Sequence, residues 1–446
     1  MDWAEAPVEQ LKIVPGPDVL RTSLPIEELA VAALAAVGLS GEALWEERGG
    51  TPQSISVDRE LAGYSMKSAD VLRVDGKQLA RWDPVTGFYP ARDGDWVYLH
   101  GNFPHLRDGI LAVVNAQNDR DAVARSVAGL DAADLEAQGI ERGLCISQVR
   151  DREQWRRHLQ CDGVNSLPII ELFKIGEAPV EPLAAADRPL SGIRMLDLSR
   201  VIAGPMAGRT FAEHGATVMR VSSPHLPFME SLVINTGLGK LSCHVDLDQP
   251  GGVEALRDLV GDADVFLDGY RPGALARRSF GAQELARLRP GIVSISLDAW
   301  SRSGPWSHRR GYDSLVQAAT GLAHADDGET PRLLPCQPLD YLTGYFAAIG
   351  AMVALRRRAR EGGSWRVVVS LARTAQWIWQ MTDLIGSKAA NPSSDPDFPD
   401  RVRQEMESPF GKLSVLNPAL QMPVTPPGWA SPSIPLGSSD PVWPEN

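Results

Sequence analysis

Cysteines and long apolar runs are scarce in this chain of 446 residues. The cysteines lie far apart, with no Cys-x-x-Cys pair and no spacing typical of metal ligands, so we expect buried free thiols and no metal site at Cys145, Cys161, Cys243 and Cys336. No segment approaches the roughly 20 apolar residues of a membrane helix. Residues 1–5 are acidic and lack the apolar core of a signal peptide. We therefore expect a cytoplasmic protein without membrane contact.

Basic residues are also fewer than acidic ones. The net charge is −12 and the basic residues form no long block, which argues against nucleic acid as a partner. A local arginine cluster could still hold an anionic small ligand within an acidic protein. Hydrophobic residues make up 43% of the chain, enough for a sizeable core, and the length allows two or three domains.

The chain divides into three regions that differ in composition and in hydrophobic pattern. Residues 1–180 mix helical patterns with an alternating polar and apolar strand at 95–100, which predicts a small α+β domain. Helices are expected there at about 106–114 and 131–138. A proline-rich connector leads into an α/β domain at 181–390. The tail at 391–446 is rich in proline and serine, and we expect it to lie extended along the large domain or to be partly disordered.

Strands and helices alternate in the α/β region, which predicts a parallel sheet with helices on both faces. The expected strands are 193–198, 216–221, 264–268, 292–297 and 365–371, and the main expected helices are 206–214, 252–260 and 341–360. The first strand-to-helix turn, 201–208, has no Gly-x-Gly-x-x-Gly pattern, so an NAD-dependent dehydrogenase is disfavoured. Backbone N–H groups of that turn could still face an anion.

A series of six segments runs from Leu190 to about Trp377, at 190–205, 215–221, 245–252, 264–273, 311–313 and 338–344. In this order they resemble the class III CoA-transferases, also called CoA-transferase family III. The resemblance implies a Rossmann-like parallel sheet in a large domain and a smaller α+β domain. It also implies a homodimer in which two chains interlock like links.

Pieces of the small domain stand before the catalytic segment here, whereas in ordinary members they follow it. Residues 91–99 resemble the strand that opens the family's small domain, and 135–145 resemble its later helix and turn. Residues 408–413 and 425–427 resemble the usual C-terminus. Such a permuted order is tolerated where the original termini lie close together.

The resemblance places Asp340 at the family's catalytic aspartate. A carboxylate suits CoA transfer between two acids, because it can attack an acyl-CoA to form a mixed anhydride and then carry CoA as an aspartyl thioester. This chemistry uses CoA as a substrate and needs no metal. From its position alone, Asp340 could instead cap the helix beginning near Tyr341. The helix dipole would hold a carboxylate there in its ionised form.

Further residues are assigned to CoA binding by the same resemblance. They are Arg200, Val201, Ile202, Ala203 and Gly204 in the first turn, with Val245, Gly269, Tyr270, Arg271, Arg277 and Arg310. Guanidinium groups recognise phosphates well, and a tyrosine ring can stack on adenine. Each arginine could also be a solvated surface charge, and Tyr270 could simply pack in the sheet.

Some family positions differ in this chain. Ser222 stands where many members have glutamate, Lys240 to Ser242 where many have a Lys-Arg-Ser run, and Asp248 where many have lysine. Fewer cations should weaken or relocate contacts to a polyphosphate. The glycine-rich loop that covers the active site in some transferases is not recognisable, which leaves the acceptor acid and full activity open.

The sequence therefore predicts an acyl-CoA:carboxylate CoA-transferase, with two alternatives. An acyl-CoA racemase of the same fold needs two opposed acid/base groups. Family racemases place a histidine where this chain has Tyr312, which is a poor base at neutral pH, although His308 or His324 could substitute. The second alternative is a CoA-binding protein without catalysis, and the retained Asp340 argues against it.

Overall fold

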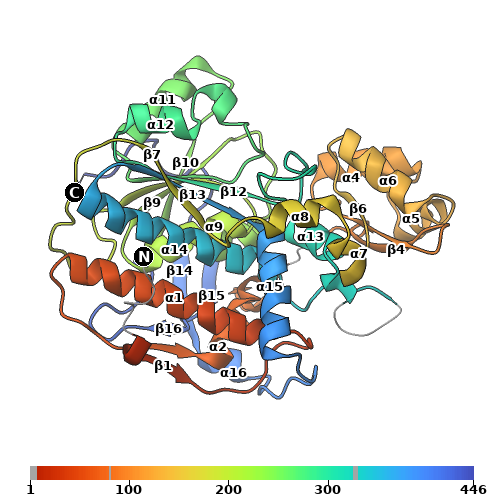
Figure 1. The fold of residues 1–446 in the computed structure, drawn as a ribbon, viewed down its shortest axis with the longest axis horizontal. Coiled ribbons are helices and arrows are strands. Elements are labelled where there is room, and N and C mark those ends of the chain that lie inside the picture. Colours follow the sequence, from red (N-terminus) through yellow and green to blue (C-terminus); the bar gives the residue numbers. More distant parts are fainter. Residues whose placement is uncertain (1–7, 80–81, 325–329, 446) are drawn as a thin grey trace.

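The computed structural model describes residues 8–79, 82–324 and 330–445, and a seven-stranded sheet lies at its centre (Figure 1). The strand order is β10-β9-β8-β11-β12-β13-β7, and every neighbouring pair is parallel except β13 with β7. The strands are β7 (Glu171–Gly176), β8 (Arg194–Leu198), β9 (Thr217–Ser222), β10 (Lys240–His244), β11 (Val265–Asp268), β12 (Val293–Asp298) and β13 (Ser364–Ser370). The α/β prediction is confirmed.

The strand order reverses at β8. The chain first adds β9 and β10 on one side of β8 and then returns to place β11 on the other side. In open α/β sheets, ligands bind at the carboxyl ends of the strands beside such a reversal. The helices that make these connections include α9 (Ala203–Glu213), α10 (Glu230–Thr236), α11 (Pro250–Gly261) and α12 (Ala282–Leu288). Residues that follow β8 and β11 are therefore expected to line a ligand site.

The long helix α14 (Pro338–Glu361) crosses α9 closely enough to bring its first turn to this edge. Gly344 makes the approach possible, because a Cβ there would lie 2.6 Å from the carbonyl oxygen of Ala203. Pro338 suits the first position of a helix, and Gly362, with a φ of 67°, ends it. Helices α13 (Asp313–Ala319) and α15 (Leu371–Ile385) pack against α14.

Helices α14 and α1 (Ile26–Glu47) pack side by side and are both long and apolar enough to cross a membrane by length and composition (Figure 1). This corrects the expectation that no segment approaches that length. The apolar window of α14 is 100% buried inside the structure and that of α1 is 72% buried. Burial of this extent is what core helices show, because their apolar side chains pack on one another.

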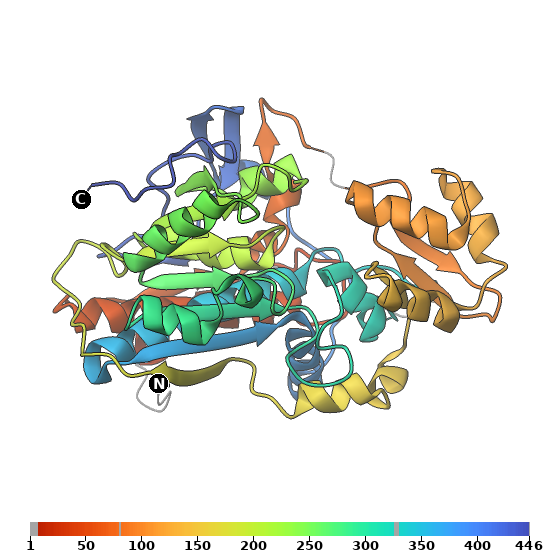
Figure 2. The same cartoon turned by 90° about the horizontal axis from the view of Figure 1, so that it is seen from above.

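A small α+β module occupies one end of the molecule (Figures 1 and 2). Its antiparallel sheet has the order β4-β5-β6, and it packs against α13 through β5 and β6. Its elements are β4 (Gly87–Pro90), β5 (Trp96–Leu99), α4 (Pro104–Val114), α5 (Arg120–Val127), α6 (Ala132–Glu141) and β6 (Ile146–Gln148). The strand predicted at 95–100 and the two predicted helices are confirmed. Helices α7 (Arg152–Arg156) and α8 (Leu159–Asn165) lead back to β7.

The tail forms regular structure with the N-terminal region, which the expectation of an extended or disordered tail missed. Its strands β14 (Arg403–Ser408) and β15 (Gly411–Leu416) pair as a hairpin, and β15 also pairs with β3 (Arg73–Val74). Strand β16 (Leu420–Gln421) pairs with β2 (Ile55–Asp58), which pairs with β1 (Leu11–Val14). Short helices α2 (Arg59–Ser65), α3 (Ser68–Val71) and α16 (Phe398–Arg401) flank these sheets. The domain boundaries near 180 and 390 stay a prediction.

Candidate active site

The turn between β8 and α9 is held in a strained conformation. Val201 has a φ of 71°, a left-handed backbone angle that a β-branched residue rarely adopts. Two glycines allow the chain to pack around this turn. A Cβ would lie 2.3 Å from the Ser199 side chain at Gly204 and 2.6 Å from it at Gly269. The ends of β8 and β11 therefore come together, and the turn faces the strand edge where a ligand is expected.

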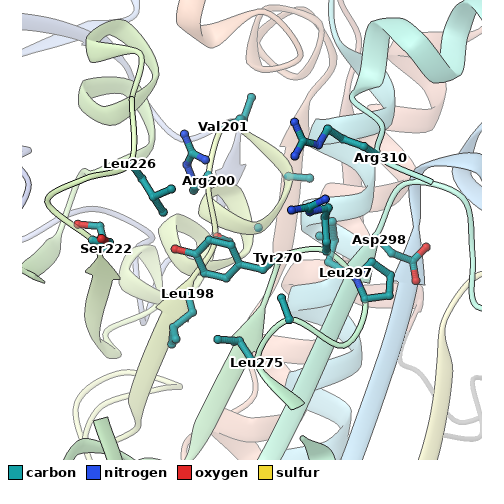
Figure 3. Close-up of a pocket in the computed structure, with 18 of the residues that line it drawn as sticks. Leu198, Arg200, Val201, Ser222, Leu226, Tyr270, Leu275, Leu297, Asp298 and Arg310 are labelled. Atoms are coloured by element: carbon teal, nitrogen blue, oxygen red, sulfur yellow. The ribbon is translucent and has the colours of Figure 1, made fainter. Parts of the chain in front are cut away.

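A cavity of about 450 Å³ opens at this edge of the sheet. Its walls come from the ends of β8, β9, β11 and β12, from the loop before α13 and from the first turn of α14. Figure 3 shows the Tyr270 ring in the middle of the lining, between Leu226 on one side and Leu297 on the other, with Arg200 and Arg310 above it. The volume is typical of sites for small molecules and cofactors.

Three arginines of the cavity have no carboxylate partner among the described residues: Arg200, Arg271 and Arg310. The Arg200 guanidinium donates to the carbonyl oxygen of Pro227 and lies 5.0 Å from the ring centroid of Phe103. Arg310 Nη1 lies 3.0 Å from Nε2 of His105. Burial, together with the charge of Arg310, lowers the pKa of Arg271. Guanidinium groups left without carboxylates at one place form a site for a polyanion.

Two other arginines line the cavity but already have carboxylate partners. Arg309 Nη2 lies 3.0 Å from Oε1 of Glu136 on α6, and its guanidinium stacks 4.2 Å from the Trp306 ring. Arg278 pairs with Asp248 at the rim. Arg309 therefore fastens the small module to the cavity wall, and neither arginine offers the unpaired charge of the first three.

Asp340 also lines this cavity, from the first turn of α14. The helix begins at Pro338 with Gln337 in the N-cap position, so Asp340 is not the capping residue, which corrects the capping alternative. Asp340 is 6% exposed, and its backbone N–H donates to Oδ2 of Asp313 at 3.0 Å. Burial and the neighbouring Asp313 charge raise the pKa of Asp340 well above its ordinary value. The helix dipole was expected to keep this carboxyl ionised, which would mean a lowered pKa. That expectation is wrong, because desolvation outweighs the dipole and the pKa is raised.

A smaller cavity of about 30 Å³ shares Asp340, Tyr312 and Val201 with the large one, and we call it the inner chamber. His100 from the small module stacks on Tyr312 with ring centroids 4.3 Å apart, and its Nδ1 lies 3.0 Å from Oγ of Ser314. Burial lowers the pKa of His100 to about 3, so the ring is neutral at physiological pH. Burial also raises the pKa of Tyr312, which makes this residue a still poorer base.

Below the turn, Lys240 and Asp197 form a buried ion pair. Lys240 Nζ lies 2.7 Å from Oδ2 of Asp197 and 2.7 Å from the carbonyl oxygen of Pro205, and the lysine is 2% exposed. Burial lowers the pKa of Lys240 to about 7 despite its partner, and the Lys240 charge contributes to holding the pKa of Asp197 below its ordinary value. Lys240 therefore holds the sheet to α9 and does not face the cavity.

Most of the predicted site residues lie together. The cavity is lined by Arg200, Val201, Ala203, Gly204, Val245, Gly269, Tyr270, Arg271, Arg310 and Asp340, as well as by Ser222 and Asp248. Ile202 lines the inner chamber instead, and Arg277 lines neither cavity. The proposed racemase histidines His308 and His324 also lie outside both linings. The roles of these residues in binding stay a prediction.

Sequence reasoning missed His100, Phe103 and His105, because their small module is distant in sequence from Asp340. It also missed Asp298 at the end of β12, whose pKa burial raises to about 7. The position of Asp298 directly after a buried strand could have indicated it. All four cysteines are free and buried, as expected. Within the described ranges, no group of three His, Cys, Asp or Glu side chains could hold a metal ion.

The family model described as CoA-transferase family III matches residues 190–401. The chain is 30% identical over 399 residues to an acyl-CoA transferase of Gibberella moniliformis, covering 78% of this chain and 70% of that protein. It is 39% identical over 199 residues to acetyl-coenzyme A transferase nodX of Hypoxylon pulicicidum, covering 43% of this chain and 34% of that protein. The mouse succinyl-CoA:glutarate CoA-transferase is 33% identical over 194 residues, which cover 39% of this chain and 43% of that protein. The chain thus matches about a third of the nodX protein and less than half of the mouse protein.

Among solved structures, the chain is similar to that of Rv3272 from Mycobacterium tuberculosis, in its orthorhombic form. The identity is 28%, the likeness covers 44% of this chain and 60% of that chain, and the TM-score is 0.41.

Proposed function

Because this chain belongs to CoA-transferase family III, we propose that it moves CoA from an acyl-CoA thioester to a carboxylic acid, with Asp340 as the nucleophile. One observation carries the proposal. A buried carboxyl and three arginines without carboxylate partners among the described residues line the same cavity of about 450 Å³. A CoA thioester has matching ends, because its nucleotide carries phosphates and its other end carries the reactive carbonyl. The arginines would hold the phosphates and Asp340 would face the thioester.

The reaction begins when an ionised Asp340 oxygen attacks the thioester carbonyl. The C–S bond breaks, which gives a mixed anhydride and the CoA thiolate. The thiolate then attacks the Asp340 carbonyl carbon, and the donor acid leaves with one oxygen that belonged to Asp340. In the second half of the cycle, an acceptor carboxylate attacks the aspartyl thioester and releases the CoA thiolate, which then attacks the acceptor carbonyl. The new acyl-CoA leaves, and one oxygen of the acceptor stays on Asp340. No proton is gained or lost over the cycle.

The surroundings of Asp340 fit these steps. Its burial removes water that would hydrolyse an anhydride or an aspartyl thioester. The raised pKa makes the ionised form more basic, at the cost of a smaller ionised fraction in acid. The turn at Val201 presents the first backbone N–H groups of α9 beside the cavity, where they could stabilise charge on the thioester oxygen.

The proposal is tested by incubating the protein with a panel of acyl-CoAs and carboxylic acids and measuring new acyl-CoAs by mass spectrometry. We expect a new acyl-CoA together with the free donor acid. Deuterium entering the α-carbon from D₂O without CoA exchange would point to a racemase. CoA binding without either reaction would contradict the enzyme assignment.

Two wider proposals accompany this one. We propose an interlocked homodimer, to be tested by light scattering on the purified protein, where a monomer mass would contradict it. We also propose a cytoplasmic location, to be tested by fractionation of the cells that produce the chain.

A further inference from the structure

The small module meets the arginines of the large cavity at the start of α4. Among the described residues of this module, His105 alone lines the cavity, and it is the second residue of α4. Its Nε2 atom lies 3.0 Å from Nη1 of Arg310. The Arg200 guanidinium lies 5.0 Å from the ring centroid of Phe103, two residues before His105. The module therefore contacts two of the three arginines that have no carboxylate partner among the described residues.

The contact with Arg310 shows which nitrogen of His105 lacks a proton. A guanidinium has only hydrogen-bond donors, so Nε2 of His105 is the acceptor of this bond. An imidazole that accepts at Nε2 is neutral and keeps its proton on Nδ1. The His105 side chain is exposed at the cavity, so a second proton can reach the ring from solvent.

The surroundings of His105 oppose a positive charge on its ring. Its charged neighbours are Arg310 from the loop before α13, Arg200 from the turn after β8 and Arg271 from the segment after β11. Partial burial, and then these three charges, lower the pKa of His105. The N-terminal end of α4 adds partial positive charge. The same arginines and helix end attract an anion, and an anion bound there would reverse the effect on His105.

We infer that His105 is a further binding residue, which contacts a phosphate group of the CoA nucleotide beside Arg310 and takes up one proton from solvent as CoA binds. The inference rests on the proposed function, which puts the phosphates at the arginines. Protonated imidazole has a donor on each nitrogen. Once Nε2 carries a proton it no longer accepts from Arg310, and the Nη1 group of Arg310 becomes available to the phosphate as well.

This proton uptake makes CoA affinity depend on pH. Phosphates that neutralise the arginines remove the repulsion on His105, so its pKa is higher in the complex than in the free protein. The complex then holds more protons, and the contribution of His105 to affinity is lost as the pH rises through its pKa in the complex. The 3′-phosphate of CoA has a pKa of its own, about 6 for a phosphate monoester. A variant without the imidazole separates the two contributions.

The test is calorimetry of CoA binding to the full chain at pH 7, in two buffers that differ in ionisation enthalpy, which counts the protons taken up. His105→Gln can still accept from Arg310 but does not titrate. We expect it to bind CoA about 10-fold more weakly, as for the loss of a hydrogen bond to a charged group, and to take up fewer protons. His244→Gln is the matched control, because His244 is exposed and lines neither cavity. It should bind CoA and protons as the unmodified protein does.

The outcomes separate this inference from the proposed function. The same Kd and the same proton count for His105→Gln and the unmodified protein would overturn the inference and leave CoA binding intact. Failure of the unmodified protein to bind CoA would instead overturn the proposed function.

A kinetic comparison tests whether His105 acts on the phosphates. The donors are an active acyl-CoA and the matching acyl-pantetheine, which has no nucleotide. His105→Gln should lower kcat/KM by about 10-fold with the acyl-CoA and leave kcat/KM with the acyl-pantetheine unchanged. An equal fall with both donors would place the effect of His105 at the thioester and overturn the inference.

Discussion

The cavity has an outer end, lined by Arg200, Arg271 and Arg310, and an inner end at Asp340, which it shares with the inner chamber, and the two ends differ in the sign of their charges. The three arginines have no carboxylate partner among the described residues, whereas Asp313 adds a like charge beside the Asp340 carboxyl. Each end alone would be unfavourable, since like charges gather there. Under the proposed function, the difference would separate binding from chemistry. Positive charge would hold the part of the ligand that does not react, and burial would make the reacting carboxyl basic.

The largest expected effect comes from removing the reacting carboxyl. Asp340→Asn keeps the size of the side chain but offers no nucleophilic oxygen, so CoA transfer should fall by about 10⁴-fold or more. CoA binding, measured by calorimetry, should remain because the arginines are untouched. Asp258→Asn, on the exposed face of α11, is the control and should transfer at the normal rate. Transfer by Asp340→Asn at a rate near that of the unmodified protein would remove the distinction between the two ends.

The next effect concerns the outer end. Arg271→Gln and Arg310→Gln should each raise the Kd for CoA by about 10-fold or more, because a charged hydrogen bond to phosphate is lost. Turnover at saturating acyl-CoA should change little. Arg287→Gln is the matched control, since this arginine is 75% exposed and pairs with Glu284 outside the cavity. A fall in turnover with unchanged CoA affinity would show that the arginines do not act as the phosphate end.

A smaller effect is expected in the pH profile. Asp340 must be ionised to react, so activity is lost as the pH falls through its raised pKa. Asp313→Asn removes the like charge and should move this acidic limb to lower pH. The profile of kcat/KM against pH measures the shift. An acidic limb that stays in place would mean that Asp313 does not control the ionisation of Asp340.

The smallest expected effect is on stability. Because the folded pKa of Asp340 lies above its unfolded value, the folded state holds the proton more tightly, and stability is lost as the pH rises from the unfolded pKa to the folded pKa. At neutral pH, Asp340→Asn should therefore be more stable than the unmodified protein. Urea unfolding at pH 7 and pH 4 measures this, and the gain should shrink at the lower pH. A destabilised variant at pH 7 would contradict the raised pKa.

Much of the outer end could be predicted from the sequence, because its residues follow buried strands in order along one stretch of chain. The turn at Val201 and the Tyr270 and Arg271 pair after β11 were assigned by the resemblance to the family, as was Asp340 at the inner end, and all of them line the cavity. Arg277 does not line the cavity, whereas the neighbouring Arg278 of the short helical turn Ala276–Arg278 does, and the role of Arg277 in CoA binding stays a prediction.

The inner end could not be predicted in the same way. His100 and Phe103 belong to a module whose position depends on contacts with α13 and on the Arg309–Glu136 pair. The pKa of Asp340 depends on its burial and on Asp313, which lies 27 residues earlier in the chain. A position at the start of a helix predicts an interaction with the helix dipole but not the loss of solvation on burial. The loss of solvation decides that the pKa of Asp340 is raised and not lowered.

The central claim is that the Asp340 carboxyl carries the transferred group, and trapping with hydroxylamine tests it most directly. Hydroxylamine attacks an aspartyl thioester or anhydride and leaves an aspartyl hydroxamate, so the peptide that contains Asp340 gains one NH in mass. We predict this gain after incubation with an acyl-CoA and its absence without acyl-CoA or in Asp340→Asn. New acyl-CoA forming while the Asp340 peptide stays unmodified, or while another residue takes up the label, would contradict the account.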